Sequence, residues 1–160
     1  MLIAAPHTSN WDLAYLLALA AIFDIRVSWM GKHTLFLPPL GWLMRRVGGI
    51  PIVRHRSGNM VEQMARAFEE SEDLALVVPA EGTRGYVAHW KSGFYHIARS
   101  ASVPIVLGYL DYTRRRGGFG PALLPGGDVR SDMDEIRDFY ADKAAKFPEQ
   151  FGEVRLKEEM

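Results

Sequence analysis

The feature that most constrains the fold is a continuous apolar run of strand length, Leu74–Pro79. A strand that is apolar on both sides is typical of a parallel sheet with helices covering both faces. Leu2–Ala5 and Val103–Leu110 have the same character, and an amphipathic helical pattern, Asn59–Ser71, lies between them. This alternation predicts an α/β fold with a mostly parallel sheet flanked by helices and antiparallel last strands.

Glycine, proline and apolar spacing place the remaining elements. We expect further strands at Arg26–Met30 and Ile50–Val53, and helices at Leu13–Phe23, Leu40–Val47 and Ser92–Ser100. A turn at Arg114–Gly118 would join the last two strands, and a closing surface helix would span Ser131–Lys146. The first helix, Leu13–Phe23, has no polar face, and its 11 residues fall short of the roughly 20 that span a bilayer. We therefore expect it to be buried, with contact to a membrane surface as the alternative.

Length and composition fit one domain over residues 1–160, with 48% hydrophobic residues for a core. The absence of cysteine excludes disulfides, thiolate metal sites and a cysteine nucleophile, and it permits a cytoplasmic location. The net charge is zero, but residues 1–127 carry 13 Lys and Arg against 9 Asp and Glu, while residues 128–160 carry 6 against 10. This split fits either an anionic ligand on the first part or ordinary solvated charge. Nucleic-acid binding has little support, because the arginine turn is short and lacks interleaved aromatic residues.

A polar stretch follows the first strand, where α/β proteins usually bind ligands. His7 stands five residues before Asp12, and a carboxylate that holds one imidazole nitrogen leaves the other to act as a general base. The same residues also fit a helix start, with Ser9 as the N-cap and Asp12 in the first turn. Ser9 lacks the G-x-S-x-G turn that presents a serine nucleophile, so we expect any transfer to be direct.

Other polar side chains also follow predicted strands. They are Lys32, Arg54 and the loop Glu81-Gly82-Thr83-Arg84. Right-handed crossovers bring the carboxyl ends of parallel strands to one edge of the sheet, so we expect these residues near His7. Arginine suits phosphate because its guanidinium donates two parallel hydrogen bonds. No histidine pair has metal-ligand spacing with a carboxylate, and we predict no metal site.

Taken in order, these residues resemble the four sequence blocks of the glycerolipid acyltransferases of the lysophosphatidate acyltransferase (PlsC-like) type. The blocks are His7-x4-Asp12, then Lys32 with Pro38, Pro39 and Gly41 before Arg54, then Glu81-Gly82-Thr83-Arg84, then Val103-Pro104-Ile105-Val106, within residues 3–110. A hairpin and helix over residues 111–146 would follow. The resemblance implies a glycerolphosphate-acyltransferase-like fold.

It also implies transfer of a fatty acyl group from acyl-CoA or acyl carrier protein to the hydroxyl of a lysophosphatidate-like acceptor, with no other cofactor. His7 would be the catalytic base and Asp12 its partner. Lys32 and Arg54 would contact phosphate, and Glu81, Gly82, Thr83 and Arg84 would hold the acceptor. Backbone N–H groups after His7 or near Gly82 would stabilise the oxyanion.

Several alternatives stay open. The acceptor could be another lyso-lipid, such as lyso-ornithine lipid, or the chain could be a non-catalytic lipid-binding relative. Many members carry membrane-anchoring helices before the first block, and here six residues precede His7, so we expect either a shortened protein or a start beyond an anchor. Peripheral contact with the cytoplasmic face of a membrane would then use apolar residues that could equally be core: Leu35, Phe36, Leu37, Leu40, Trp42 and Leu43, beside Arg45 and Arg46.

Overall fold

The computed structural model describes residues 1–52, 57–83 and 85–159. Its centre is a six-stranded sheet with the order β3-β2-β4-β1-β5-β6. The strands are β1 Leu2–Ala5, β2 Val27–Lys32, β3 Gly49–Ile52, β4 Ala75–Pro79, β5 Ile105–Asp111 and β6 Arg116–Leu123. Every neighbouring pair is parallel except β5 and β6, which form the predicted antiparallel hairpin.

The chain does not lay down its strands in spatial order. After β1 it crosses to β2 and then to β3, and only later does β4 enter the gap between β1 and β2. Ala5 at the end of β1 is opposite Pro79 at the end of β4. The loops that follow these two strands therefore start side by side.

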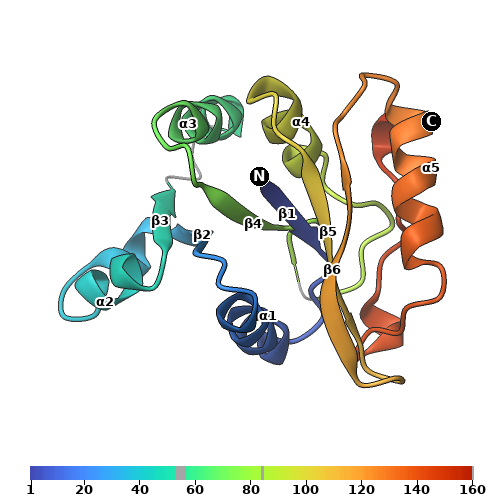
Figure 1. The fold of residues 1–160 in the computed structure, drawn as a ribbon, viewed down its shortest axis with the longest axis horizontal. Coiled ribbons are helices and arrows are strands. Elements are labelled where there is room, and N and C mark those ends of the chain that lie inside the picture. The colour runs from blue at the N-terminus through green and yellow to red at the C-terminus, as the bar shows by residue number, and fades with distance from the viewer. Residues whose placement is uncertain (53–56, 84, 160) are drawn as a thin grey trace.

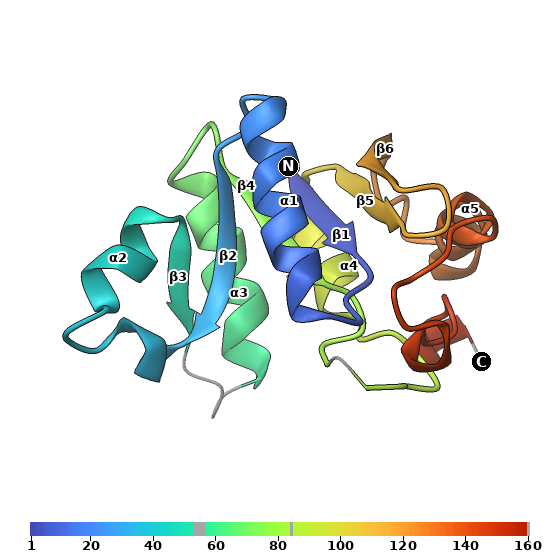
Figure 2. The same ribbon diagram turned by 90° about the horizontal axis from the view of Figure 1, so that it is seen from below.

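The helices and short 3-10 turns cover the sheet on both faces. They are α1 Asn10–Ile22, η1 His33–Phe36, α2 Gly41–Arg46, α3 Ser57–Glu69, α4 Gly93–Ser100, α5 Val129–Tyr140, η2 Pro148–Gln150 and η3 Lys157–Glu159. Figure 1 shows α3 and α4 on one face and α1 on the other. In Figure 2, β1 runs down toward the edge at which its loop turns into α1. The closing helix ends at Tyr140, earlier than predicted, and its N-cap is Asp128, whose carboxylate accepts the Ser131 N–H.

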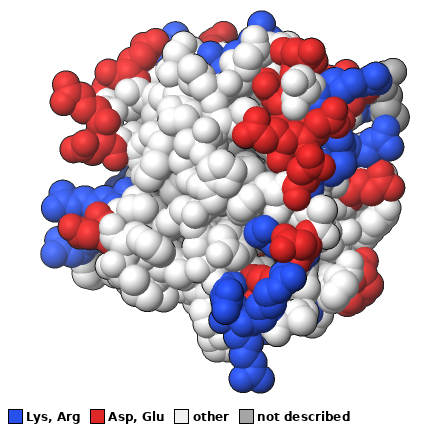
Figure 3. All heavy atoms as spheres, turned by 45° about the vertical axis from the view of Figure 1, so that its right-hand side comes forward, with Lys and Arg blue, Asp and Glu red and all other residues white. Residues whose placement is uncertain are grey.

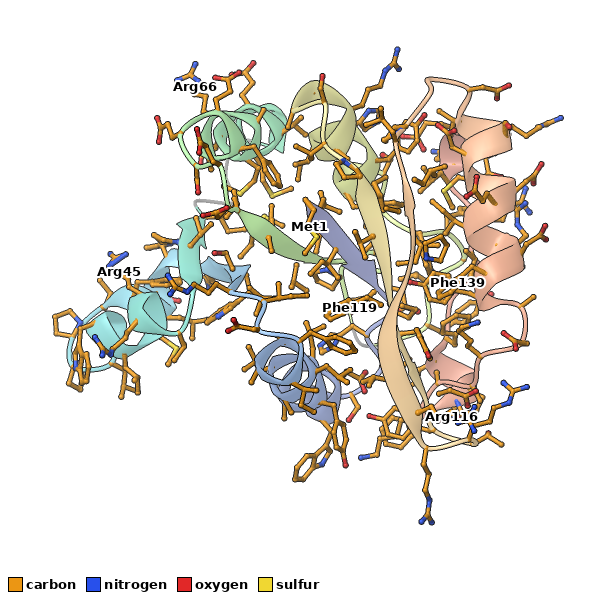
Figure 4. All side chains as sticks on the ribbon, in the orientation of Figure 1. Met1, Arg45, Arg66, Arg116, Phe119 and Phe139 are labelled. Atoms are coloured by element: carbon orange, nitrogen blue, oxygen red, sulfur yellow. The ribbon has the colours of Figure 1, made fainter. Side chains whose placement is uncertain are left out.

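The two faces carry cores of different size. The larger core packs side chains of β1, β4 and β5 such as Leu2, Leu76 and Ile105 against α3, α4 and α5. The smaller one centres on Ile3 and Val77 beneath α1. In Figure 4, Phe119 of β6 and Phe139 of α5 are labelled on the hairpin side of the molecule, and the Phe119 ring meets Phe23 just beyond α1.

The first helix is not buried on all sides, and that prediction was wrong. Leu16 and Ala20 face the sheet, while Trp11, Tyr15 and Ile22 are 59%, 49% and 76% exposed. The reason is that no second long helix in the described part of the chain flanks α1 on this face (Figure 1). No helix of the described residues combines the length and apolarity needed to cross a bilayer.

A second apolar surface lies at the β3 edge of the sheet, and we call residues 33–47 the apolar lobe (Figure 2). Phe36 is buried there under the Arg45 guanidinium, which lies 5.3 Å from the ring centroid. Apart from the half-buried Met44, the other large apolar side chains of the lobe are exposed: Leu35, Leu37, Leu40, Trp42, Leu43 and Val47. The core interpretation of this stripe thus holds for Phe36 and fails for the rest.

Candidate functional site

The site lies where the β1 and β4 loops leave the sheet. Pro6 and His7 follow β1 directly, and Ser9 then caps α1, its hydroxyl accepting the Trp11 N–H at 3.2 Å. Asp12 completes a capping box with Ser9. The helix-start interpretation of this stretch is therefore confirmed, and it places Asp12 on the turn that faces His7.

Asp12 is held by three hydrogen bonds and is only 8% exposed. One carboxylate oxygen, Oδ2, accepts the N–H groups of Thr8 and Ser9, each at 2.8 Å. The other, Oδ1, accepts the hydroxyl of Tyr112 at 2.6 Å. Such charge-assisted bonds fix the plane of the carboxylate.

His7 stands next to this carboxylate. Its Nδ1 is 3.8 Å from Asp12 Oδ2, and the imidazole is 26% exposed. This separation is longer than a hydrogen bond but close enough for an ion pair, and catalytic hydrogen bonds in ligand-free sites are often long. Nδ1 is therefore the ring nitrogen that faces the carboxylate.

Glu81 supports His7 from beneath. Its carboxylate is fully buried, with Oε2 accepting the His7 N–H at 2.8 Å and Oε1 accepting the Gly152 N–H at 3.0 Å. Burial raises the pKa of Glu81, the Gly152 and His7 N–H groups act against that rise, and the negative charge of Asp12 adds to it. We expected Glu81 to hold the acceptor, but both of its oxygens are bonded to the backbone, so the side chain joins the His7 loop to the C-terminal segment instead.

Two contributors were missed by the sequence interpretation, Tyr112 and Gly152. Tyr112 lies in the turn after β5, 100 positions after Asp12. Burial first, and then the hydrogen bond and charge of Asp12, raise the pKa of Tyr112 above its usual range. The phenol therefore stays protonated at neutral pH and acts as the donor. No sequence signal at either position marks the contact.

The remaining predicted residues are placed as follows. Gly82 has a φ of +69°, and a β-carbon on it would lie 3.0 Å from the Lys91 side chain, so any other residue would be strained there. Thr83 is exposed beside it. Lys32 is exposed at the end of β2, two strands from β1, which corresponds to about 10 Å. Arg54 and Arg84 lie outside the described residues.

The expected oxyanion donors near His7 are already in use. The N–H groups of Thr8 and Ser9 bind Asp12, and that of Gly82 donates to the Pro79 carbonyl at 3.1 Å. Because a backbone N–H that already donates to a protein oxygen is not available to a substrate oxygen, this expectation is wrong for these three groups.

A groove of about 260 Å³ opens beside His7 and Asp12. Most of its wall is apolar and comes from α1, β2, β4 and β5: Leu16, Leu19, Trp29, Met30, Val77, Pro79 and Leu110. A groove that is apolar except for a few convergent polar groups is the usual form of a small-molecule site. No cluster of His, Asp and Glu able to hold a metal ion occurs among the residues that the structure describes.

Charged side chains are unevenly spread on the surface. Figure 3 shows a wide area without Lys, Arg, Asp or Glu, bordered by acidic clusters and by a group of cations at its lower end. Arg114 and Arg115 lie in the β5–β6 turn, and Arg116, labelled in Figure 4, begins β6. The Arg114 guanidinium pairs with the Asp111 carboxylate at 2.7 Å. This pair holds the turn, which agrees with the interpretation of the charge as ordinary surface charge.

Comparison with known proteins gives three findings. No curated protein matches the chain. Its fold is similar to the crystal structure of the 1-acyl-sn-glycerophosphate (LPA) acyltransferase PlsC from Thermotoga maritima, with a TM-score of 0.54 and 18% identity, over 91% of this chain and 68% of that one. At this identity the likeness shows a shared single-domain α/β fold. A family model described as Acyltransferase matches residues 1–107, which is more than half of the sequence and includes both His7 and Glu81, so the chain belongs to the Acyltransferase family.

Proposed function

We propose that this protein transfers a fatty acyl group from acyl-CoA or acyl carrier protein to the hydroxyl of a lysophosphatidate-like glycerolipid. The observation that carries the proposal is the His7 imidazole, backed by the fixed Asp12 carboxylate beside an apolar groove. Family membership supports the reaction type. The apolar wall suits an acyl chain, because burying each CH₂ contributes about 0.8 kcal/mol.

In this mechanism His7 acts as a general base. Nε2 takes the proton of the acceptor hydroxyl while its oxygen forms a bond to the thioester carbon. The C–S bond then breaks, and the imidazolium returns the proton to the thiolate. Asp12 stabilises the imidazolium from the Nδ1 side. A positioned base of this kind contributes about 10²- to 10⁴-fold.

The supporting residues divide into two groups. Glu81 positions the His7 loop through its backbone bond. Lys32, Arg54, Thr83 and Arg84 are our candidates for the phosphate and head group of the acceptor, with Gly82 shaping their loop. No cofactor besides the thioester co-substrate is required, because a thioester needs no activating metal.

The test is release of free thiol from acyl-CoA, with and without lysophosphatidate, by the parent and by His7→Ala. We expect acceptor-dependent release by the parent that falls at least 10²-fold in the variant. Acyl carrier protein as donor and a panel of lyso-lipids, including lyso-ornithine lipid, identify the substrates. Acceptor-independent release would indicate a thioesterase, and no release with any acceptor would favour a lipid-binding relative.

We further propose that the protein is cytoplasmic and docks on a membrane surface through the apolar lobe. Leu37, Leu40 and Trp42 are 56%, 59% and 68% exposed, and Arg45 and Arg46 lie among them to meet acidic head groups. The parent should sediment with vesicles that contain anionic lipid, whereas Trp42→Glu should stay in the supernatant. Leu124→Glu, at a 63% exposed site outside the lobe, is the matched control and should bind normally. If both variants bind the vesicles equally well, the apolar lobe is not the docking surface.

A further inference from the structure

The segment beyond the family-matched region supplies a hydrogen bond to the proposed catalytic pair. The family model ends at residue 107, while Tyr112 lies five residues further on, in the turn after β5. Its hydroxyl donates to Asp12 Oδ1 at 2.6 Å. This is the carboxylate oxygen that the backbone of the His7 loop does not bind.

The Tyr112 bond restricts rotation of the Asp12 carboxylate plane. Backbone bonds to Oδ2 alone would allow the carboxylate plane to swing about them. A third bond at the opposite oxygen fixes that plane, and with it the direction from Oδ2 to His7 Nδ1, which is 3.8 Å away. Second contacts of this kind commonly orient the groups that act on a substrate.

We propose that Tyr112 is a positioning residue for the His7–Asp12 pair, acting through the Asp12 carboxylate. The proposal rests on the function proposed above. Tyr112 donates to Oδ1 of this carboxylate and so holds Oδ2 toward the imidazole. The chain outside the matched family region is then part of the acyl-transfer machinery.

The charged and titratable neighbours of this network come from four elements. Tyr15 on α1 packs edge-on against the Tyr112 ring with centroids 6.2 Å apart, and Lys146 lies 6.0 Å from the same ring. Glu81 contacts Asp12 electrostatically from the β4 loop, and His7 faces it from the β1 loop. All of these remain in place when only the Tyr112 oxygen is removed.

Removing that oxygen has a directional effect on proton binding. In Tyr112→Phe the Asp12 carboxylate loses a donor and its negative charge becomes less dispersed, so it stabilises the His7 imidazolium more strongly. The pKa of His7 then rises. The acid limb of the rate profile, which reports the base, moves to higher pH, by about half a pH unit.

The experiment compares Tyr112→Phe with Tyr95→Phe. The Tyr95 hydroxyl donates to the Asp132 carboxylate at 2.7 Å, between α4 and α5, so its removal deletes the same kind of bond outside the groove. We expect Tyr112→Phe to lower kcat about tenfold, with KM for both substrates within twofold and the acid limb displaced upward. Tyr95→Phe should match the parent in all three. Equal loss at every pH with no displacement, or the same loss in both variants, would overturn the proposal.

A second readout separates this proposal from the proposed function. NMR titration of the His7 imidazole needs no substrate, and its pKa should be higher in Tyr112→Phe than in the parent and in Tyr95→Phe. If the parent transfers no acyl group while the His7 pKa still rises, the reaction is wrong and the positioning network stands. If acyl transfer occurs and the His7 pKa is the same in all three proteins, the assignment of Tyr112 is wrong.

Discussion

Replacing Asp12 by asparagine separates its structural role from its chemical one. An asparagine can keep its carbonyl oxygen at the Oδ2 position, where it still accepts the N–H groups of Thr8 and Ser9. Its NH₂ group then takes the Oδ1 position and donates to the Tyr112 oxygen, because a phenol hydroxyl accepts as well as donates. All three contacts survive, and only the negative charge is lost.

The size of each effect follows from that geometry. Losing charge assistance in the bonds costs about 1 kcal/mol, and losing a negative charge at the start of α1 costs about 0.3–1 kcal/mol. We expect Asp12→Asn to lower the free energy of unfolding by about 1–2 kcal/mol. Asp12→Ala leaves two backbone N–H groups and a phenol without an acceptor, at about 1–3 kcal/mol for each buried group, and should lose about 3–5 kcal/mol.

Acyl transfer should respond differently from stability. Both variants lack the carboxylate that stabilises the His7 imidazolium, so both should lose about 10²- to 10⁴-fold in kcat. Urea unfolding and thiol release on the same preparations give the two quantities. If Asp12→Asn transfers acyl groups at a rate within threefold of the parent, Asp12 has no chemical role. If the two variants unfold at the same urea concentration, the capping geometry is not what holds the helix start.

Three further changes test contacts that hold the fold together. Glu81→Gln sets an NH₂ group against one of the two backbone N–H donors, and we expect a loss of about 2 kcal/mol in urea unfolding together with reduced acyl transfer; the exposed Thr83→Ala is the control and should change stability by less than about 0.5 kcal/mol. Gly120→Ala would place a β-carbon 2.3 Å from the Phe139 ring and should lower the free energy of unfolding by about 1–3 kcal/mol. Gly85→Ala, where a β-carbon would meet nothing within 4 Å, is the control and should leave thermal unfolding unchanged. Tyr95 donates to Asp132 at 2.7 Å, and burial, followed by that carboxylate, raises the pKa of Tyr95 to about 12. Because the phenol of the unfolded chain ionises at lower pH, the stability that this contact contributes is present below about pH 10. It is lost as the pH rises toward 12. An alkaline unfolding series in which Tyr95→Phe retains the full slope of the parent would contradict this assignment.

The sheet could be read from the sequence because its strands are marked locally. Leu74–Pro79 and Val103–Leu110 are apolar on both sides, and the glycines and prolines around α2 set its ends. The His7–Asp12 arrangement was also accessible, since both of its interpretations depend on neighbours within five residues. Local patterns of this kind survive folding because they are satisfied within one element or one loop.

What the sequence did not reveal depends on distant partners. The exposure of Trp11 and Tyr15 on α1 follows from what covers that face, and an all-apolar helix has no mark that says which side is left open. The inward turn of Glu81 requires the Gly152 N–H, and the third bond of Asp12 requires Tyr112. Contacts across 71 and 100 positions leave no periodic signal in a single sequence.

The late entry of β4 has a consequence for how the molecule folds. A chain emerging from the ribosome makes β1, β2 and β3 before it makes the strand that joins β1 to β2, so the first half cannot close its own sheet. Parallel pairing between distant segments is slow, because the connecting chain must lose conformational entropy before any stabilising contact forms. The same insertion brings the Glu81 loop against His7. Nascent chains that end before residue 75 should therefore depend on chaperones, and the proposed catalytic site should form together with the middle of the sheet.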